Sequence, residues 1–145
     1  MKKKLTAVIF GVTGQDGSYL AKYLLKKNYK IVGITRKVKK SYYRFKLLNI
    51  NKKIKLIRGN AVNFKFVKKL IKNNKNIKEI YYLSGKSSVT KSFSNPIESF
   101  KSNTLGILNI LENVKNINKN IRVFNAASGQ FYGNNKKSIY NEKSY

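Results

Sequence analysis

A glycine-rich segment, in which Gly11, Gly14 and Gly17 lie between apolar residues 5–10 and an amphipathic stretch from Ser18, has the pattern of a phosphate-binding turn. Glycine permits a tight turn, a close approach of the backbone to phosphates, and close packing of a helix on a strand. The helix N-terminus adds free N–H groups and a partial positive charge. These features predict a site for the pyrophosphate of a dinucleotide. The predicted contacts are Gly11, Thr13, Gly14, Gln15, Asp16 and Gly17.

The residues about 20 positions beyond the glycines indicate which dinucleotide would bind, because NAD is held there by an Asp or Glu. Residues 34–37 contain no carboxylate and instead include Arg36 and Lys37. A guanidinium can bind a ribose 2′-phosphate with two hydrogen bonds, and a neighbouring ammonium adds charge. We therefore predict NADP as the cofactor. NAD is the alternative, because any position in so basic a chain is often Lys or Arg.

Further candidates follow the other predicted strands, at the edge where open α/β sheets bind ligands. They are Asn60, Ala61, Leu83, Ser84, Gly85 and Ser128. Asn60 could meet the adenine ring, and the small residues after the fourth strand let the backbone approach the middle of the cofactor. Ser128 could hydrogen-bond a substrate oxygen. The alternative is that Ser84 and Ser128 are ordinary loop hydroxyls.

Strand and helix patterns alternate along the whole chain. Predicted strands are 5–10, 31–34, 54–57, 79–84 and 122–127, and predicted helices are 18–27, 62–71 and 100–114. This alternation predicts the α/β class, with a Rossmann-type parallel sheet of about five strands and helices on both faces. We treat 1–145 as one domain, with a helical turn near 43–48 in the basic segment 37–53 and a polar tail at 134–145.

The three predicted helices show apolar periodicity, which in the helix 62–71 comes from Val62, Phe66, Val67, Leu70 and Ile71. In the first helix, Leu20, Tyr23 and Leu24 form the predicted buried face. The long helix follows Pro96, the only proline of the chain. Its periodic residues are Phe100, Thr104, Ile107, Leu108, Leu111 and Val114.

Composition limits the classes of function. The formal charge of +27 suggests a nucleic-acid partner, but the arginines are only Arg36, Arg44, Arg58 and Arg122, and the lysines are spread evenly. We therefore expect no specific nucleic-acid binding. The absence of cysteine and histidine excludes disulfides, thiolate or imidazole metal sites and imidazole catalysis, and favours a reducing cytoplasm. Without these ligands we expect no bound metal. No apolar run approaches the roughly 20 residues of a membrane span, so we also expect no membrane partner.

With these residues placed, the chain resembles the GDP-mannose 4,6-dehydratase group of the extended short-chain dehydrogenase/reductase family. The most specific segment is 11–21, because Gln-Asp-Gly-Ser-Tyr-Leu is characteristic of that group. Further matches are residues 87–89, 92–93, 95–96, 103, 106, 111–112 and 124–133. The resemblance covers nearly the whole chain but only the N-terminal part of a family member, which implies that the C-terminal substrate domain is absent.

The resemblance implies a reaction on GDP-mannose in which NADP takes a hydride from C4 of the sugar. A carboxylate then helps to remove the C5 proton, water leaves from C6, and the hydride returns to C6. Ser128 matches the hydroxyl residue that hydrogen-bonds the reacting oxygen. The carboxylate position is Gln130, whose amide is far too weak a base to accept the C5 proton. Asn60 replaces a customary Asp, and Lys86 stands where an amide is usual.

The Tyr-x-x-x-Lys pair of the family, whose tyrosine is the base for hydride transfer, is missing from this chain. Tyr140 has Ser144 at that spacing, and the pair Tyr132 and Lys136 lies upstream of the family's position, so we interpret it as chance. The resemblance implies that the longer protein forms a homo-oligomer and that this chain alone is inactive. The alternatives are another nucleotide-sugar epimerase or 4-keto reductase, and a catalytically dead dinucleotide-binding module.

Overall fold

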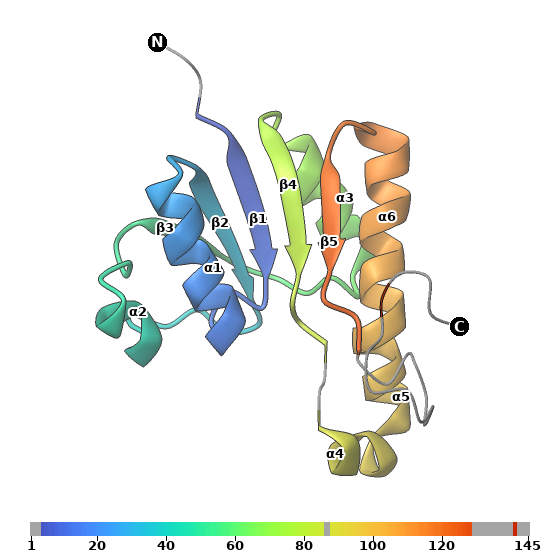
Figure 1. The fold of residues 1–145 in the computed structure, drawn as a ribbon. Helices are drawn as coiled ribbons and strands as arrows, with labels where there is room; N and C mark the ends of the chain where they lie inside the picture. The colour runs from blue at the N-terminus through green and yellow to red at the C-terminus, as the bar shows by residue number, and fades with distance from the viewer. Residues whose placement is uncertain (1–3, 86–87, 129–140, 142–145) are drawn as a thin grey trace.

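The structure, a computed structural model, describes residues 4–85, 88–128 and 141. Strands and helices alternate along the chain (Figure 1). In chain order the elements are β1 (Thr6–Phe10), α1 (Gln15–Lys26), β2 (Lys30–Thr35), α2 (Tyr43–Leu47), β3 (Ile54–Arg58), α3 (Phe64–Lys72), β4 (Ile77–Tyr82), α4 (Val89–Ser94), α5 (Pro96–Phe100), the π-helical turn η1 (Lys101–Leu105), α6 (Gly106–Ile117) and β5 (Arg122–Asn125). The predicted α/β class is confirmed.

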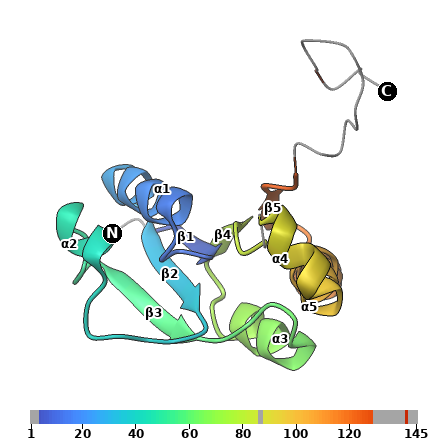
Figure 2. The ribbon, with the colours of Figure 1, turned by 90° about the horizontal axis from the view of Figure 1, so that it is seen from below.

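The strands form a parallel sheet in the order β3-β2-β1-β4-β5. The chain builds outward from β1 in one direction through β2 and β3, and in the other through β4 and β5. Because βαβ crossovers are right-handed, this reversal puts helices on opposite faces. Figure 2 shows α1 and α2 on one side of the sheet and α3 on the other, where α6 also packs. The carboxyl ends of β1 and β4 flank the point of reversal, where such sheets bind ligands.

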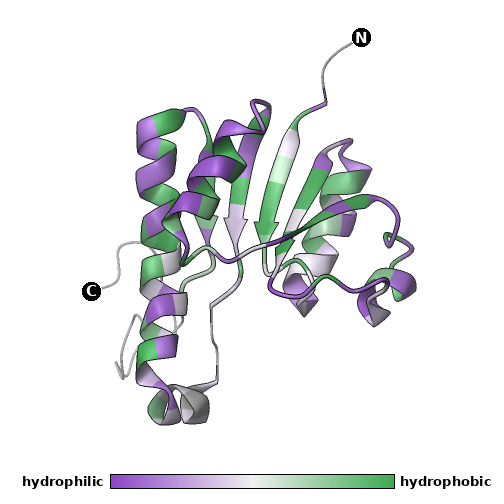
Figure 3. Cartoon of the chain, turned by 180° about the vertical axis from the view of Figure 1, so that it is seen from behind, coloured by the Kyte–Doolittle hydropathy of each residue, from purple (hydrophilic) through white to green (hydrophobic). Residues whose placement is uncertain are grey.

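The central strand β1 is buried along its whole length. Val8 and Phe10 pack in the core beneath α3 and α6, whereas Ala7 and Ile9 pack in the core beneath α1 and α2. A strand covered on both faces is apolar at nearly every position, which explains the hydrophobic run that follows Thr6 in the sequence. In Figure 3 β1 is pale to green along its length, while other strands also carry purple, and the helices mix purple and green as amphipathic helices do.

The first helix differs from its prediction at its start and on its buried face. α1 begins at Gln15 rather than Ser18. Its buried residues are Gly17, Ser18, Ala21 and Leu24. Tyr23 is 56% exposed, so the prediction that it lies on the buried face is wrong. The small residues let α1 lie close to the sheet, and the larger ring of Tyr23 turns to solvent, where the Lys27 ammonium lies 5.6 Å from its centre.

The helix predicted over 100–114 is divided into the end of α5, η1 and α6. Of its periodic residues, Phe100, Leu108 and Leu111 are 64%, 50% and 47% exposed, whereas Val114 is buried and Ile107 packs against the core. Asn109 and Asn113 are buried as well. The face toward the sheet therefore combines apolar residues with two amides. None of the helices in the described ranges has the length and apolar character needed to span a bilayer.

The two buried asparagines connect α6 to the turn between β3 and α3. The Asn109 Nδ2 atom donates hydrogen bonds of 2.9 Å to the backbone oxygens of both Ala61 and Val62. The Asn113 Nδ2 atom donates to the oxygen of Asn109 at 2.8 Å and to that of Phe64 at 3.5 Å. Buried amides are stable only when paired in this way. The turn after β3 is thus held from behind by side chains of α6.

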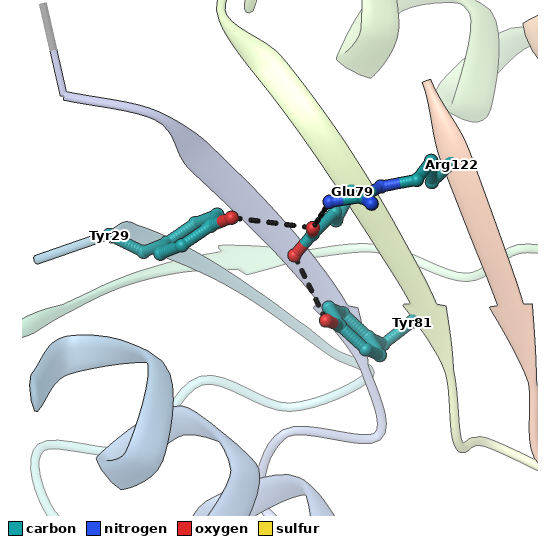
Figure 4. A network of polar contacts seen from close by, with 4 residues as sticks. All are labelled: Tyr29, Glu79, Tyr81 and Arg122. Carbon is teal, nitrogen blue, oxygen red and sulfur yellow. Dashed lines mark hydrogen bonds and ion pairs between the residues drawn. The ribbon is translucent and has the colours of Figure 1, made fainter. Parts of the chain in front are cut away.

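On the α1 side of the sheet, Glu79 of β4 is the centre of a polar network (Figure 4). Its carboxylate is 8% exposed and accepts hydrogen bonds from the hydroxyls of Tyr29 at 3.3 Å and Tyr81 at 2.9 Å. The guanidinium of Arg122 on β5 forms an ion pair with the same carboxylate. Burial, and then the hydrogen bond to Glu79, raise the pKa of Tyr81 to about 12. Glu79 therefore joins β4, β5 and the segment before β2.

We predict that stability at alkaline pH depends on Tyr81. Its folded pKa of about 12 lies above the ordinary value of 10.0. The folded state therefore disfavours the tyrosinate, and the stabilisation is complete below pH 10 and lost as the pH rises toward 12. In urea unfolding at about pH 9 and about pH 11, wild type should lose more stability between the two pH values than Tyr81→Phe. Tyr43→Phe, at an 80% exposed position, should behave as wild type; equal losses in all three proteins would contradict the prediction.

We also predict that Asn109→Leu destabilises the chain by about 1–3 kcal/mol, because it removes two buried hydrogen bonds and leaves their acceptors unpaired. The measurement is the free energy of unfolding in urea. Asn116→Leu, at an exposed position of the same helix, is the matched control and should change stability by less than about 0.5 kcal/mol. Similar small effects of both substitutions would show that the turn after β3 does not depend on α6.

Candidate functional site

The turn after β1 requires glycine at two positions. Gly11 has φ +82°, and a Cβ atom on it would lie 2.6 Å from the backbone oxygen of Leu83. A Cβ on Gly17 would lie 2.3 Å from the oxygen of Gly11. The turn is closed by the N–H of Gly14, which donates to that same oxygen at 2.9 Å. The chain therefore passes between β4 and the start of α1 through a space that has no room for a side chain.

The first turn of α1 faces this site with its backbone donors. Gly14 is the N-cap residue and has no side chain to accept from the first turn. The N–H groups at the start of an α-helix have no partner within the helix. Here they lie at Gln15, Asp16 and Gly17, at the carboxyl edge of the sheet. This arrangement favours an anion in front of the helix, as the sequence predicted.

A cavity of about 220 Å³ opens at the same edge, between the ends of β1, β2, β3 and β4 and the turn η1. It is lined by Phe10, Gly11, Thr13, Ile34, Thr35, Arg36, Gly59, Asn60, Ala61, Val62, Tyr82, Ser84, Glu98, Lys101 and Ser102. Pockets that enclose a small molecule usually measure about 300–1,000 Å³. The cavity thus has room for part of a dinucleotide, such as its adenosine end.

The structure brings together some of the predicted site residues and separates others. Those that line the cavity are Gly11, Thr13, Arg36, Asn60, Ala61 and Ser84. Gly14, Gln15, Asp16 and Gly17 form the adjoining start of α1. Leu83 packs its backbone on Gly11, and a Cβ on Gly85 would lie 3.1 Å from the Asn103 side-chain oxygen.

The loop that carries Arg36 is held by hydrogen bonds. The hydroxyls of Thr35 and Tyr42 both donate to the backbone oxygen of Lys37, the first at 3.1 Å. The N–H of Lys39 donates to the Tyr42 hydroxyl at 3.2 Å. Lys37 is not among the residues that line the cavity, so only its backbone takes part in placing Arg36.

Asn60 forms part of a local turn at the end of β3. Its side-chain oxygen accepts from the N–H of Val62 at 3.1 Å, and its backbone oxygen accepts from the N–H of Asn63 at 3.1 Å. The side-chain oxygen is therefore engaged, and the Nδ2 group is the end that could donate to a base in the cavity. The bonds from Asn109 hold the next residue, Ala61, in place.

Sequence reasoning missed the wall formed by Tyr82 and η1. The Tyr82 hydroxyl donates to the backbone oxygen of Ser102 in η1. A Cβ on Gly106 would lie 2.1 Å from that hydroxyl, so glycine leaves room for the phenol. Burial raises the pKa of Tyr82, which keeps the phenol a neutral donor. The π-helical turn places Lys101 and Ser102 on the cavity, and such turns often occur at functional sites. No local sequence pattern signals a π-helical turn.

Of the two predicted catalytic positions, Ser128 lies in the described residues, beyond β5 at the same edge of the sheet. Ala127 has φ +53°, and its N–H donates to the side-chain oxygen of Asn125 at 3.3 Å. Ser128 follows and is exposed, and it is not among the residues that line the cavity. Gln130 lies outside the described residues.

The sequence matches known proteins over nearly all of its length. A sequence model of the family described as GDP-mannose 4,6 dehydratase matches residues 8–145. The chain is 32% identical to GDP-mannose 4,6 dehydratase of Drosophila melanogaster over 146 residues, which cover 94% of this chain and 37% of that protein. It is 31% identical to GDP-mannose 4,6 dehydratase of Homo sapiens over 141 residues, covering 91% of this chain and 38% of that one. The chain thus spans little more than a third of these relatives.

Solved structures share the fold. The UDP-Glc/GlcNAc 4-epimerase of Campylobacter jejuni matches with a TM-score of 0.83 and 21% identity over 97% of this chain and 42% of that one. UDP-glucose 4-epimerase of Bifidobacterium longum, solved in complex with NAD+ and UDP, matches with a TM-score of 0.80 and 20% identity over the same shares. At this identity the likeness shows the fold alone. On the match to the family model, this chain belongs to the GDP-mannose 4,6-dehydratase family of extended short-chain dehydrogenases/reductases.

Proposed function

We propose that this chain is the cofactor-binding part of an enzyme that converts GDP-mannose to GDP-4-keto-6-deoxymannose, and that it binds NADP. The observation that carries the proposal is the glycine turn at the start of α1 together with the cavity beside it. In this arrangement the pyrophosphate lies against residues 11–17, and the adenosine end lies in the cavity between β2 and β3.

The residues present fit such a cofactor. Gly14 has no side chain to block the approach of a pyrophosphate, and the first turn of α1 supplies unpaired N–H donors. Arg36 and Lys101 bring positive charge to the cavity, against the single carboxylate of Glu98. The absence of an acid near Arg36 supports NADP over NAD, because a carboxylate there would repel the 2′-phosphate.

When bound, NADP would supply the group that takes the hydride from the sugar and later returns it. The described residues of this chain would bind and orient the cofactor, with Ser84 lining the cavity beside the turn. Ser128 would hydrogen-bond the reacting sugar oxygen, by its match to the family's hydroxyl residue. The described residues supply neither the family's tyrosine–lysine pair, whose tyrosine is the base for hydride transfer, nor its carboxylate, whose position is Gln130.

Gln130 favours a second candidate function. A dehydratase needs a group that accepts the C5 proton, and an amide is too weak a base for that step. A 4-keto reductase or epimerase of the same fold needs no carboxylate at this position. A dinucleotide-binding module without activity would also tolerate glutamine there.

Self-association of the longer protein is also part of the proposal. Ile97 and Phe100 of the α5–η1 segment and Leu108 and Leu111 of α6 are 68%, 64%, 50% and 47% exposed. Exposed apolar side chains gathered on neighbouring turns support a contact with another chain.

We predict saturable binding of NADPH to the 145-residue chain, measured by the fluorescence of the bound nicotinamide. The titration is done at about 0.15 M salt, where long-range attraction to the basic surface is screened. Gly14→Val should weaken binding at least about ten-fold, because its side chain would occupy the space of the pyrophosphate without changing the net charge. Asn120→Val, in the loop at the opposite edge of the sheet, is the matched control and should bind as wild type.

The reaction itself is tested on a longer protein that includes this chain, by identifying the products formed from GDP-mannose. A 4-keto-6-deoxy product supports the dehydratase. Its absence, together with a product epimerised at C4 or with reduction of a separately supplied 4-keto sugar nucleotide, supports the second candidate. If NADPH shows no saturable binding to the 145-residue chain, the cofactor site itself is wrong.

A further inference from the structure

A second arginine lies beside Arg36, and the sequence did not mark it as part of the site. In the pairing of β2 with β3, Thr35 at the end of β2 is opposite Arg58 at the end of β3, so Arg36, the residue after β2, follows at the same edge of the sheet. Arg36 and Arg58 line one hollow together with Gly59, Asn60, Asn63 and Phe66. Arg36, Gly59 and Asn60 also line the cavity beside the glycine turn, so the two spaces share these residues.

The ends of the two strands are fixed by backbone contacts. The N–H of Gly59 donates to the oxygen of Thr35 at 2.9 Å. A Cβ on Gly59 would lie 2.0 Å from the ring of Phe66, so the ring packs directly on the glycine backbone. The packed ring and glycine therefore line the hollow together with the two arginines.

Neither guanidinium forms an ion pair within the described part of the chain. The ion pairs found there join Lys115 to Glu112 and Arg122 to Glu79. Two neighbouring cations repel each other, and an anion bound between them relieves the repulsion. A phosphate suits this place best, because each guanidinium can give it two parallel hydrogen bonds.

We propose that Arg58 acts with Arg36 to bind the 2′-phosphate of the adenosine ribose, and so determines the preference for NADP over NAD. The inference rests on the proposed function, since the adenosine must lie in the adjoining cavity. The pyrophosphate turn after β1 fixes one end of the nucleotide, and the ribose of the adenosine then lies at the end of β2. Arg58, at the end of β3, lies on the outer side of β2, because β3 is the edge strand next to β2.

The test compares two isomers of the same charge, adenosine 2′,5′-bisphosphate and adenosine 3′,5′-bisphosphate, as competitors of NADPH on the full 145-residue chain. Because the isomers differ only in where the phosphate is attached, general attraction to a chain of charge +27 cancels. The variants are Arg58→Leu and Arg36→Leu. Arg44→Leu, at an exposed position of α2 away from both spaces, removes the same charge and is the control.

Wild type should bind the 2′,5′ isomer at least about ten-fold more tightly than the 3′,5′ isomer. This factor is the lower end of the range expected for loss of a charge-assisted hydrogen bond. Arg58→Leu should remove most of this difference, as should Arg36→Leu, while Arg44→Leu should keep it. If Arg58→Leu weakens both isomers equally, or neither, the proposed role of Arg58 is wrong although the dinucleotide site stands. If wild type binds neither NADPH nor NADH, the proposed function fails, and this inference with it.

Discussion

The contact between Gly11 and the end of β4 is the constraint on which the rest of the site depends. Because Gly11 has no side chain, the turn lies against the backbone of Leu83. This contact brings the carboxyl ends of β1 and β4 together where the strand order reverses. Gly17 then lets α1 start directly against the same turn. Any Cβ at either position would push α1 away from the sheet and remove its N-terminal N–H groups from the cavity.

The cavity beside this turn is held by polar groups that are themselves buried. Asn109 reaches from α6 to the turn after β3, and Tyr82 reaches from β4 to η1. The hydrogen bonds of these two side chains hold backbone that lines the cavity, and they connect the different segments that form its walls. The positive charge of the chain is spread over its surface. At the carboxyl edge of the sheet, however, positive charge occurs together with the N–H donors of α1 and a cavity, which favours a phosphorylated ligand over a general polyanion.

Much of the fold could be predicted from the sequence, because strand and helix periods alternate clearly. The turn after β1 could also be predicted, because it has no room for side chains and the glycines in the sequence indicate this. The predicted strands all exist, and their ends differ by at most two residues. The choice of faces failed in part: Tyr23, Leu108 and Leu111 are exposed, and Asn109 is buried although the sequence did not mark it, whereas Val114 is buried. A buried asparagine is recognisable only from the backbone oxygens that it pairs with, which come from distant parts of the chain. Arg58 could not be recognised from the sequence for a similar reason: Arg36 is distant from it along the chain and is brought close only by the pairing of β2 with β3.

The most direct test follows the backbone N–H signals of the ¹⁵N-labelled chain by NMR as NADPH is added at about 0.15 M salt. If the turn and the start of α1 receive the pyrophosphate, the largest and saturable shifts should occur at residues 11–17, with further shifts around Arg36 and Asn60. Shifts spread over lysine-bearing surfaces, with the signals of residues 11–17 unchanged, would show that the turn does not bind the cofactor.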